Sequence, residues 1–282
     1  MTVALSADVE DVGAFVRSRI GAGVVDIDPF PHVCIHNVFP DDYYQRLLAN
    51  WPDEDEFIEM GEGGIFGLFF RPTASRIPRL GERGLVRAGR VKTFAVWDHF
   101  RSIVKRDIIP ELATKLSDSI VAMMRPGGAE AHPAIKAEDL EIVHDFLIIR
   151  RNSHILAPHL DDLRSLIQLL IYFPEDDSRP HLGTQYFKQV GGGRSLSPRE
   201  LGDARIAQYA EPLGIQVVEA KRIPFTRNTL VANLNNPTSW HGQHLNERYD
   251  RKGYQAFVGV RSDLLRLFFD DVSASLLAQH AG

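Results

Sequence analysis

A histidine and a carboxylate on either side of one apolar residue form the first pattern in this sequence that could do chemistry. His159 and Asp161 flank Leu160. In an extended strand, residues i and i+2 project from the same face, so an imidazole nitrogen and a carboxylate oxygen can meet at one point. Mixed nitrogen and oxygen ligands suit divalent iron, and two histidines with one carboxylate leave coordination positions open. We therefore interpret the pair as part of a metal site that needs a second histidine.

His241 is the candidate for that second histidine. It lies far downstream of Asp161, shortly after the apolar run 230–232, a separation that a β-barrel can close. A competing interpretation assigns no metal. In that case His159 is a polar residue at a strand end, and Asp161 belongs to a turn or caps a helix.

Length and composition indicate a soluble globular domain. The chain has 282 residues, of which 44% are hydrophobic and 24% charged, as in ordinary soluble domains. A net charge of −5 gives no general attraction to nucleic acid or to anionic membranes. Cys34 is the only cysteine, so no intrachain disulfide forms. With no export signal at residues 1–15 and no apolar run of the roughly twenty residues that span a membrane, we expect a cytoplasmic protein.

Strand patterns dominate the second half of the chain. Helical periodicity predicts helices at 7–19, 41–51 and 91–124, the last broken at Pro110. Composition predicts strands at 31–38, 140–151, 166–173, 183–187, 223–235 and 253–260. We expect the strand at 140–151 to pair with the strand at 166–173, and His241 to lie in the turn between the last two strands.

Two glycine-containing segments join these elements. Residues 60–90 are rich in Gly and Arg and are interpreted either as a loop over the mouth of the fold or as a plain connector. Residues 188–221 are predicted to be an insertion with a helix signal at 197–200, and we hypothesise that they form a lid. The tail at 264–282 is expected to pack a short helix on the outside.

These motifs together resemble the iron(II)- and 2-oxoglutarate-dependent oxygenases, especially those with a prolyl-hydroxylase-like core. The matching motifs, in order, are His159/Asp161, the apolar strand 167–173, Gly183-Thr184, the Ser-x-His-Gly motif at 239–242, and Arg251. The resemblance covers 139–263 well and 28–52 loosely. It implies a mainly β fold, a double-stranded β-helix (jelly roll, cupin-like) with supporting helices. The single domain 1–282 would then have support at 1–135, the core at 139–263 with its insertion at 188–221, and the tail.

The resemblance also implies cofactors and their ligands. Iron(II) would be held by His159, Asp161 and His241, with 2-oxoglutarate as cosubstrate and O2 as oxidant. Arg251 would pair with the distal carboxylate of 2-oxoglutarate, because a guanidinium binds a planar carboxylate through two charge-assisted hydrogen bonds. Arg248 competes for that role, and Arg251 could instead be a surface residue at the start of a strand.

Further residues are assigned around the cofactor. Tyr172 matches a position where related cores place a hydroxyl near the same carboxylate, although a buried core tyrosine is an equal alternative. Gln168 and Gln255 are weaker candidates for the cofactor pocket. His154 and His244 are close to the motifs in sequence but do not occupy a ligand position, so we expect neither to bind metal.

The implied activity is that of a dioxygenase which hydroxylates, or otherwise oxidises, an unactivated C–H bond. Related halogenases carry a small residue where this chain has Asp161, which favours hydroxylation. The substrate is expected to be a small molecule such as an amino-acid, saccharide or natural-product intermediate, since the Gly-Thr turn is similar to that of small bacterial tailoring members. One alternative is a prolyl-type protein side-chain hydroxylase. A second is a non-catalytic jelly-roll ligand-binding protein.

Overall fold

The structure is a computed structural model that describes most of the chain. The described residues are 8–60, 64–70, 94–124, 127–132, 134–151, 155–161, 165–191, 208–244, 247 and 249–268. The helices are α1 (Asp8–Ala22), α2 (Asp41–Ala49), α3 (Phe94–Ile103), α4 (Ile109–Lys115), α5 (Ser117–Val121) and α6 (Gly128–Ala131). The strands are β1 (Val25–Asp26), β2 (His32–His36), β3 (Ile58–Glu59), β4 (Ile65–Phe69), β5 (Leu140–Arg150), β6 (Ile155–Leu160), β7 (Ser165–Tyr172), β8 (Thr184–Gln189), β9 (Gln208–Tyr209), β10 (Val217–Ile223), β11 (Thr229–Leu234), β12 (His241–His244) and β13 (Arg251–Val260).

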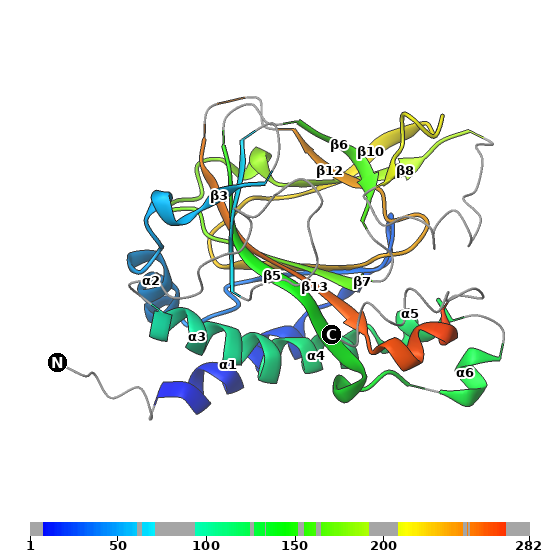
Figure 1. The fold of residues 1–282 in the computed structure, drawn as a ribbon, viewed down its shortest axis with the longest axis horizontal. Coiled ribbons are helices and arrows are strands. Elements are labelled where there is room, and N and C mark those ends of the chain that lie inside the picture. Colours follow the sequence, from blue (N-terminus) through cyan, green and yellow to red (C-terminus); the bar gives the residue numbers. More distant parts are fainter. Residues whose placement is uncertain are drawn as a thin grey trace.

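Two antiparallel sheets face each other and form the core (Figure 1). The large sheet has the order β1-β2-β11-β7-β13-β5-β4-β3, and the small sheet has the order β10-β8-β12-β6-β9. From β5 onward the chain crosses repeatedly between the sheets, so that β5, β7, β11 and β13 lie in one and β6, β8, β10 and β12 in the other. This arrangement is a double-stranded β-helix, or jelly roll, which confirms the predicted fold class.

The large sheet is buried on both faces, which explains why its strands look almost continuously apolar in the sequence. In β7, Ile167, Leu169 and Ile171 pack into the core on the helix side. Leu170 and Tyr172, which alternate with them, pack toward the small sheet. The inner face of the large sheet is therefore the one that can present side chains to a site between the sheets.

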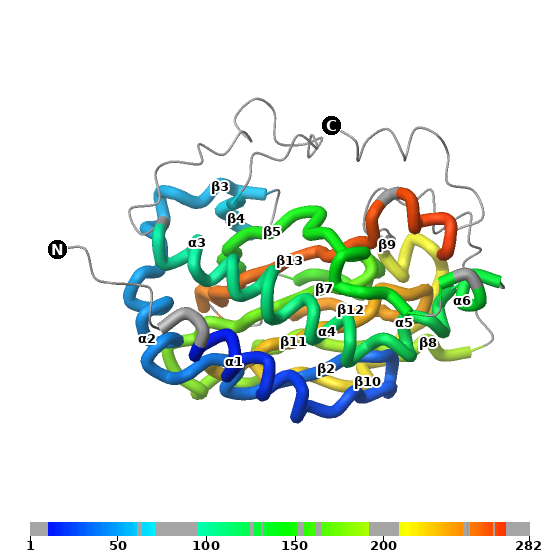
Figure 2. Tube along the Cα trace, turned by 90° about the horizontal axis from the view of Figure 1, so that it is seen from below, coloured from blue at the N-terminus to red at the C-terminus, as the bar shows by residue number. Residues whose placement is uncertain are grey.

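Helices cover the outer face of the large sheet. Figures 1 and 2 show α1, α3 and α4 lying across it, on the side away from the small sheet. Trp97 and Phe100 of α3 are fully buried against Phe173 at the end of β7, with ring centroids 5.8 and 6.2 Å from that ring. The helices thus support the sheet from behind. No helix in the described parts of the chain combines the length and the apolar composition needed to cross a membrane.

The predicted break at Pro110 takes an unexpected form. A π-helical segment, Val104–Ile108, joins α3 to α4, and Pro110 lies in the first turn of α4. Proline lacks the N–H that an α-helix would use at this point. The N–H of Ile109, just before the proline, makes a π-type hydrogen bond to the Val104 carbonyl, so the chain stays helical through the predicted break.

Strand pairing corrects three expectations. Strand β5 pairs with β13 and β4, not with the strand at 166–173, because β13 lies between β5 and β7. His241 begins strand β12 instead of lying in a turn. The single strand predicted at 223–235 is two elements, since β10 ends at Ile223 in the small sheet and β11 begins at Thr229 in the large one.

Two predicted loops contain strands. Within 60–90, strand β4 pairs with β5 and extends the large sheet. Within the proposed insertion at 188–221, β9 pairs with β6, and β10 begins there and pairs with β8 along its length. The helix signal at 197–200 and the glycines at 192–193 lie outside the described residues. Residues 262–267 form a short 3₁₀ helix that reaches into the predicted tail, and residues 269–282 of that tail lie outside the described residues.

Candidate metal centre and the cavity around it

His159, Asp161 and His241 come together between the two sheets. His159 is near the end of β6 and is the register partner of His241, the first residue of β12. Asp161 follows β6 directly, one residue beyond Leu160. All three side chains are buried, and one ligand atom from each lies within 4.8 Å of the others. Among the described residues, this is the group of His, Cys, Asp and Glu side chains that could hold a metal ion.

The two imidazoles are held in one orientation by the backbone. Nδ1 of His159 lies 2.9 Å from the Ala157 carbonyl oxygen, and Nδ1 of His241 lies 2.9 Å from the Ser239 carbonyl oxygen. A carbonyl oxygen only accepts hydrogen bonds, so Nδ1 carries the proton in each ring. The lone pair of each neutral ring is then on Nε2, the atom that metal-binding histidines commonly offer while Nδ1 donates to a carbonyl.

Both Nε2 atoms point at Asp161. They lie 3.5 Å (His159) and 3.2 Å (His241) from the two carboxylate oxygens of Asp161. Oδ2 of Asp161 and Nε2 of His241 are buried and have no hydrogen-bond partner. Three lone-pair donors that converge in a buried space need a cation or a shared proton between them. The residues therefore fit a divalent metal ion.

The charges of the cluster are strongly coupled. Burial opposes ionisation of Asp161, but the charge that His241 carries when protonated and the proximity of both imidazoles hold the pKa of Asp161 well below its usual range. Burial and the charge of His241 lower the pKa of His159. Burial also acts to lower the pKa of His241, yet the Asp161 carboxylate outweighs it and raises that pKa. A proton and a metal ion therefore compete for the same carboxylate and imidazole.

A second polar group surrounds Arg251. This side chain is buried, and its Nη1 donates to Gln243 Oε1 at 2.7 Å while Nη2 donates to Thr184 Oγ1 at 3.1 Å. The hydroxyl of Tyr172 shares a hydrogen bond of 2.6 Å with Thr184 Oγ1, and the guanidinium lies 4.7 Å from the Tyr172 ring centroid. Arg251 and Tyr172 are thus brought together through Thr184.

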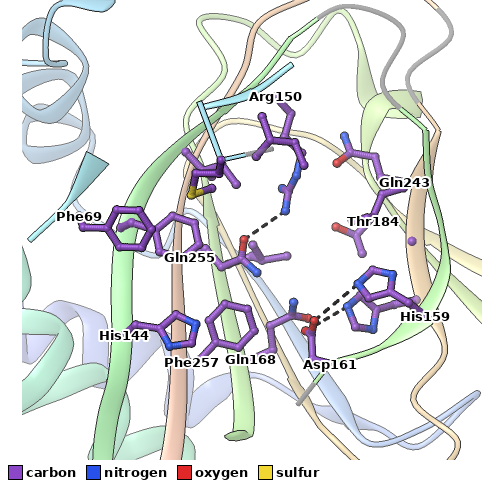
Figure 3. Close-up of a pocket in the computed structure, with 18 residues that line it drawn as sticks. Phe69, His144, Arg150, His159, Asp161, Gln168, Thr184, Gln243, Gln255 and Phe257 are labelled. Carbon is purple, nitrogen blue, oxygen red and sulfur yellow. Dashed lines mark hydrogen bonds and ion pairs between the residues drawn. The ribbon is translucent and has the colours of Figure 1, made fainter. Parts of the chain in front are cut away.

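Both groups adjoin one cavity of about 390 Å³ (Figure 3). Its size lies within the roughly 300–1,000 Å³ typical of small-molecule sites. Gln168 and Gln255 line it, whereas Arg251 and Tyr172 lie behind the lining residues Thr184 and Gln243.

Three other residues close to the motifs in the sequence are His244, Arg248 and His154. His244 is exposed on β12 and is not among the residues that could hold a metal ion. Arg248 and His154 lie outside the described residues. Arg251 is consequently the one of the two arginine candidates whose surroundings can be described.

Sequence reasoning missed several residues of the cavity. Thr184 was noticed only as part of a turn, and Gln243 not at all. Arg150, at the end of β5, also lines the cavity, as do the rings of Phe69, Phe146, His144 and Phe257. Period two along β5 places Arg150 on the same face as Phe146, so this signal was present in the sequence. What was missing was which face of β5 points inward.

Comparison with known proteins finds similarity at the level of structure. No protein-family model matches the sequence, and no curated protein matches it. Among solved structures, HygX from Streptomyces hygroscopicus with nickel and 2-oxoglutarate bound is 13% identical, with 97% of this chain and 94% of that chain covered and a TM-score of 0.46. The non-heme alpha-ketoglutarate-dependent epimerase SnoN from nogalamycin biosynthesis is 14% identical, with 90% and 84% covered and a TM-score of 0.43.

A prolyl-4-hydroxylase from Pseudomonas putida also matches. It is 12% identical, with 88% of this chain and 98% of that chain covered and a TM-score of 0.40. These identities and TM-scores carry no argument about activity. The function is therefore argued from the cluster and the cavity themselves.

Proposed function

We propose that this protein is an iron(II)- and 2-oxoglutarate-dependent dioxygenase that hydroxylates, or otherwise oxidises, an unactivated C–H bond of a small molecule. With iron, 2-oxoglutarate and O2 bound, a hydroxylation would convert one C–H bond to C–OH and 2-oxoglutarate to succinate and CO2. The observation that carries the proposal is the buried convergence of His159, Asp161 and His241 with two lone-pair donors that have no partner. Two histidines and one carboxylate form the ligand set that non-heme iron oxygenases use.

The chain supplies an anchor for the cosubstrate beside this ligand set. Arg251 would bind the distal carboxylate of 2-oxoglutarate through its guanidinium, and the hydroxyls of Tyr172 and Thr184 would hydrogen-bond to the same group. Arg251 has no carboxylate partner among the described residues, and its Nε is buried without a hydrogen bond. Burial makes such a charge-assisted contact stronger than it would be at the surface. Gln168 and Gln255 would bound the cofactor space from the large sheet.

The cavity favours a small-molecule substrate. It lies between two packed sheets and is lined by buried side chains of both. This setting suits a compact ligand better than an extended polypeptide, which needs an exposed groove or strand edge. A prolyl-type protein hydroxylase is the alternative, and mass spectrometry of a treated cell extract separates the two. An added oxygen atom on a polypeptide, rather than on a small molecule, would contradict the small-molecule assignment.

The anaerobic absorption spectrum with added iron(II) and 2-oxoglutarate tests the proposal directly. We expect a visible metal-to-ligand charge-transfer band in the wild type, a weakened band in Arg251→Ala, and none in His241→Ala. His244→Ala is the matched control, because it removes an exposed histidine from the same strand and is expected to keep the band. A folded, iron-loaded wild type without the band would contradict the proposal.

A ligand-binding measurement on the His241→Ala variant addresses the non-catalytic alternative, in which the jelly roll binds a ligand and the metal ligands are dispensable. His241→Ala would then leave ligand binding unchanged. We further propose a cytoplasmic location, which is supported by the single cysteine, Cys34.

A further inference from the structure

A second buried arginine faces the cavity and is not used by the proposed cofactor site. Arg150 is the last residue of β5, is only 7% exposed and lines the cavity. It is the direct register partner of Arg251 on β13. Side chains directly opposite each other on antiparallel strands lie on the same face, and like charges in such a pair destabilise the sheet. Two buried cations side by side therefore call for an anion.

The hydrogen-bonding capacity of Arg150 is largely unfilled. Its Nη2 donates to Gln255 Oε1 at 3.1 Å, and its Nε is buried without a partner. No carboxylate of the described residues lies within ion-pair distance of it, and a guanidinium has five N–H donors. Arg251, in contrast, already donates from both terminal nitrogens, to Gln243 and Thr184, and its remaining N–H groups are those proposed to bind 2-oxoglutarate. Arg150 thus has unfilled donors for a second ligand in the cavity.

Arg150 remains a cation in this setting. Burial, and then repulsion by Arg251, lower the pKa of Arg150 to about 9, which is still above neutral pH. A buried cation with unfilled donors is costly unless an anionic group binds it.

An aromatic wall adjoins this cation. Phe146 shares a face of β5 with Arg150, and its ring centroid lies 4.8 Å from that of Phe69 on β4 and 6.4 Å from that of Phe257 on β13. These residues belong to one apolar cluster on the cavity side of the large sheet. Figure 3 shows Phe69 and Phe257 on the side of the cavity opposite His159, and Arg150 between these rings and Gln243. Such a wall binds apolar chains or planar rings through packing and stacking.

We propose that Arg150 and the aromatic wall bind the primary substrate as an organic acid. The acid group, a carboxylate, pairs with Arg150, and the apolar chain or ring packs on Phe69, Phe146 and Phe257. This inference rests on the proposed function and narrows its substrate from small molecules in general to amphiphilic acids. The rival source of the carboxylate is 2-oxoglutarate itself, held by Arg150 and Arg251 together.

The test measures anion binding without turnover. The protein is loaded with Mn(II), saturated with 2-oxoglutarate, kept anaerobic and titrated with phenylacetate, 3-phenylpropionate, indole-3-acetate and octanoate, each beside its neutral amide. Paramagnetic broadening of the ligand proton resonances reports binding near the metal. We expect saturable broadening by at least one acid, with its amide binding at least tenfold more weakly. Arg150→Gln should lower the affinity for that acid about tenfold or more, and Arg150→Lys should restore part of the affinity.

Binding of 2-oxoglutarate, measured in the same samples, shows whether the carboxylate that pairs with Arg150 belongs to the substrate or to 2-oxoglutarate. Arg150→Gln should change its dissociation constant little, whereas Arg251→Gln should weaken it strongly. Arg222→Gln is the charge-matched control, because Arg222 is exposed on β10 and pairs with Glu219. An independent readout is the melting temperature without added anions, which Arg150→Gln should raise by removing the repulsion with Arg251.

Three results would overturn the inference. One is that Arg150→Gln and Arg251→Gln weaken the binding of 2-oxoglutarate equally, which would mean that both arginines bind the cosubstrate. Another is that none of the acids gives saturable broadening when 2-oxoglutarate is bound. The third is failure of the wild type to bind 2-oxoglutarate with Mn(II) present, which would refute the proposed function and this inference with it.

Discussion

Replacing Gly183 by alanine should damage both the fold and the cofactor site. Gly183 directly precedes β8, and the backbone at the end of β10 passes close to it. A Cβ atom at this position would lie 1.6 Å from the carbonyl oxygen of Ile223 and 3.0 Å from the backbone nitrogen of Phe225. Real Cβ atoms essentially never approach another atom within 3.0 Å, so the backbone must open by about 1.4 Å. Backbone atoms cannot move aside as the end of a flexible side chain can.

The size of the effect follows from this geometry. Overpacking of a filled interior typically costs about 1–3 kcal/mol, and a forced backbone shift belongs at the upper end. A loss of about 3 kcal/mol corresponds to a fall in melting temperature of roughly 6–12 °C for a chain of this size. Thr184 is the next residue and accepts the 3.1 Å hydrogen bond from Arg251. A displacement of this size breaks that bond, so we expect 2-oxoglutarate affinity to fall about tenfold as well, since a hydrogen bond to a charged group contributes about 1.5–3 kcal/mol.

Thermal unfolding by circular dichroism and titration of 2-oxoglutarate into the metal-loaded variant measure both effects. Gly21→Ala is the control. The nearest atom to its Cβ would be the flexible carboxylate end of Glu111 at 3.2 Å, and an alanine within helix α1 is expected to be neutral or slightly stabilising. A Gly183→Ala variant that melts within about 2 °C of the wild type, less than 1 kcal/mol of destabilisation, would refute the close approach of these two backbone segments.

Three further predictions concern buried polar groups. Asp145→Asn should destabilise the fold by about 3–5 kcal/mol in chemical denaturation, because Asp145 is buried and accepts bonds of 2.6 and 3.0 Å from Arg101; a loss below about 1 kcal/mol, the level of an exposed ion pair, would contradict this. Gln168→Leu should raise stability, by up to about 1 kcal/mol, since Oε1 of Gln168 is buried without a partner; marked destabilisation would show that this oxygen is satisfied. Asp139→Asn should cost about 1–2 kcal/mol at pH 5. Burial alone would raise the pKa of Asp139, but hydrogen bonds from the Lys136 backbone and from His132 lower it below 3.8. The stabilisation is therefore complete above pH 3.8 and is lost as the pH falls toward the lower pKa of the folded state. The free energies of unfolding of wild type and variant should therefore converge as the pH falls below 3.8. A difference between them that does not change with pH would contradict the stabilising role of the Asp139 carboxylate.

Local patterns in the sequence were enough to identify the candidate metal ligands. The i, i+2 spacing of His159 and Asp161 places both on one side of the chain in any extended backbone, whatever surrounds them. The same parity places Gln255 and Phe257 on one face of β13, and both line the cavity. Helix α1 was likewise predictable, because its apolar spacing depends only on neighbouring residues.

Patterns of this kind could not decide which strands would be neighbours. β13 is inserted between β5 and β7, and β12 takes His241 into the small sheet rather than into a turn. Pairing between strands far apart in the chain depends on the packing of the whole sandwich. When both faces of a strand are buried, as in β7, the side chains of both are apolar, and the alternation along the strand does not show which face points inward. The inward direction of β5 was therefore not readable from its composition.

The sequence by itself determined the chemical groups available to this protein: two histidines, a carboxylate and several arginines at spacings that suit extended strands. Only the tertiary structure decided that His241 lies opposite His159 and that Arg150 lies opposite Arg251. The physical reason is that register is set between strands, by hydrogen bonds and packing across the sheet. Residue spacing along a single strand carries no information about that register.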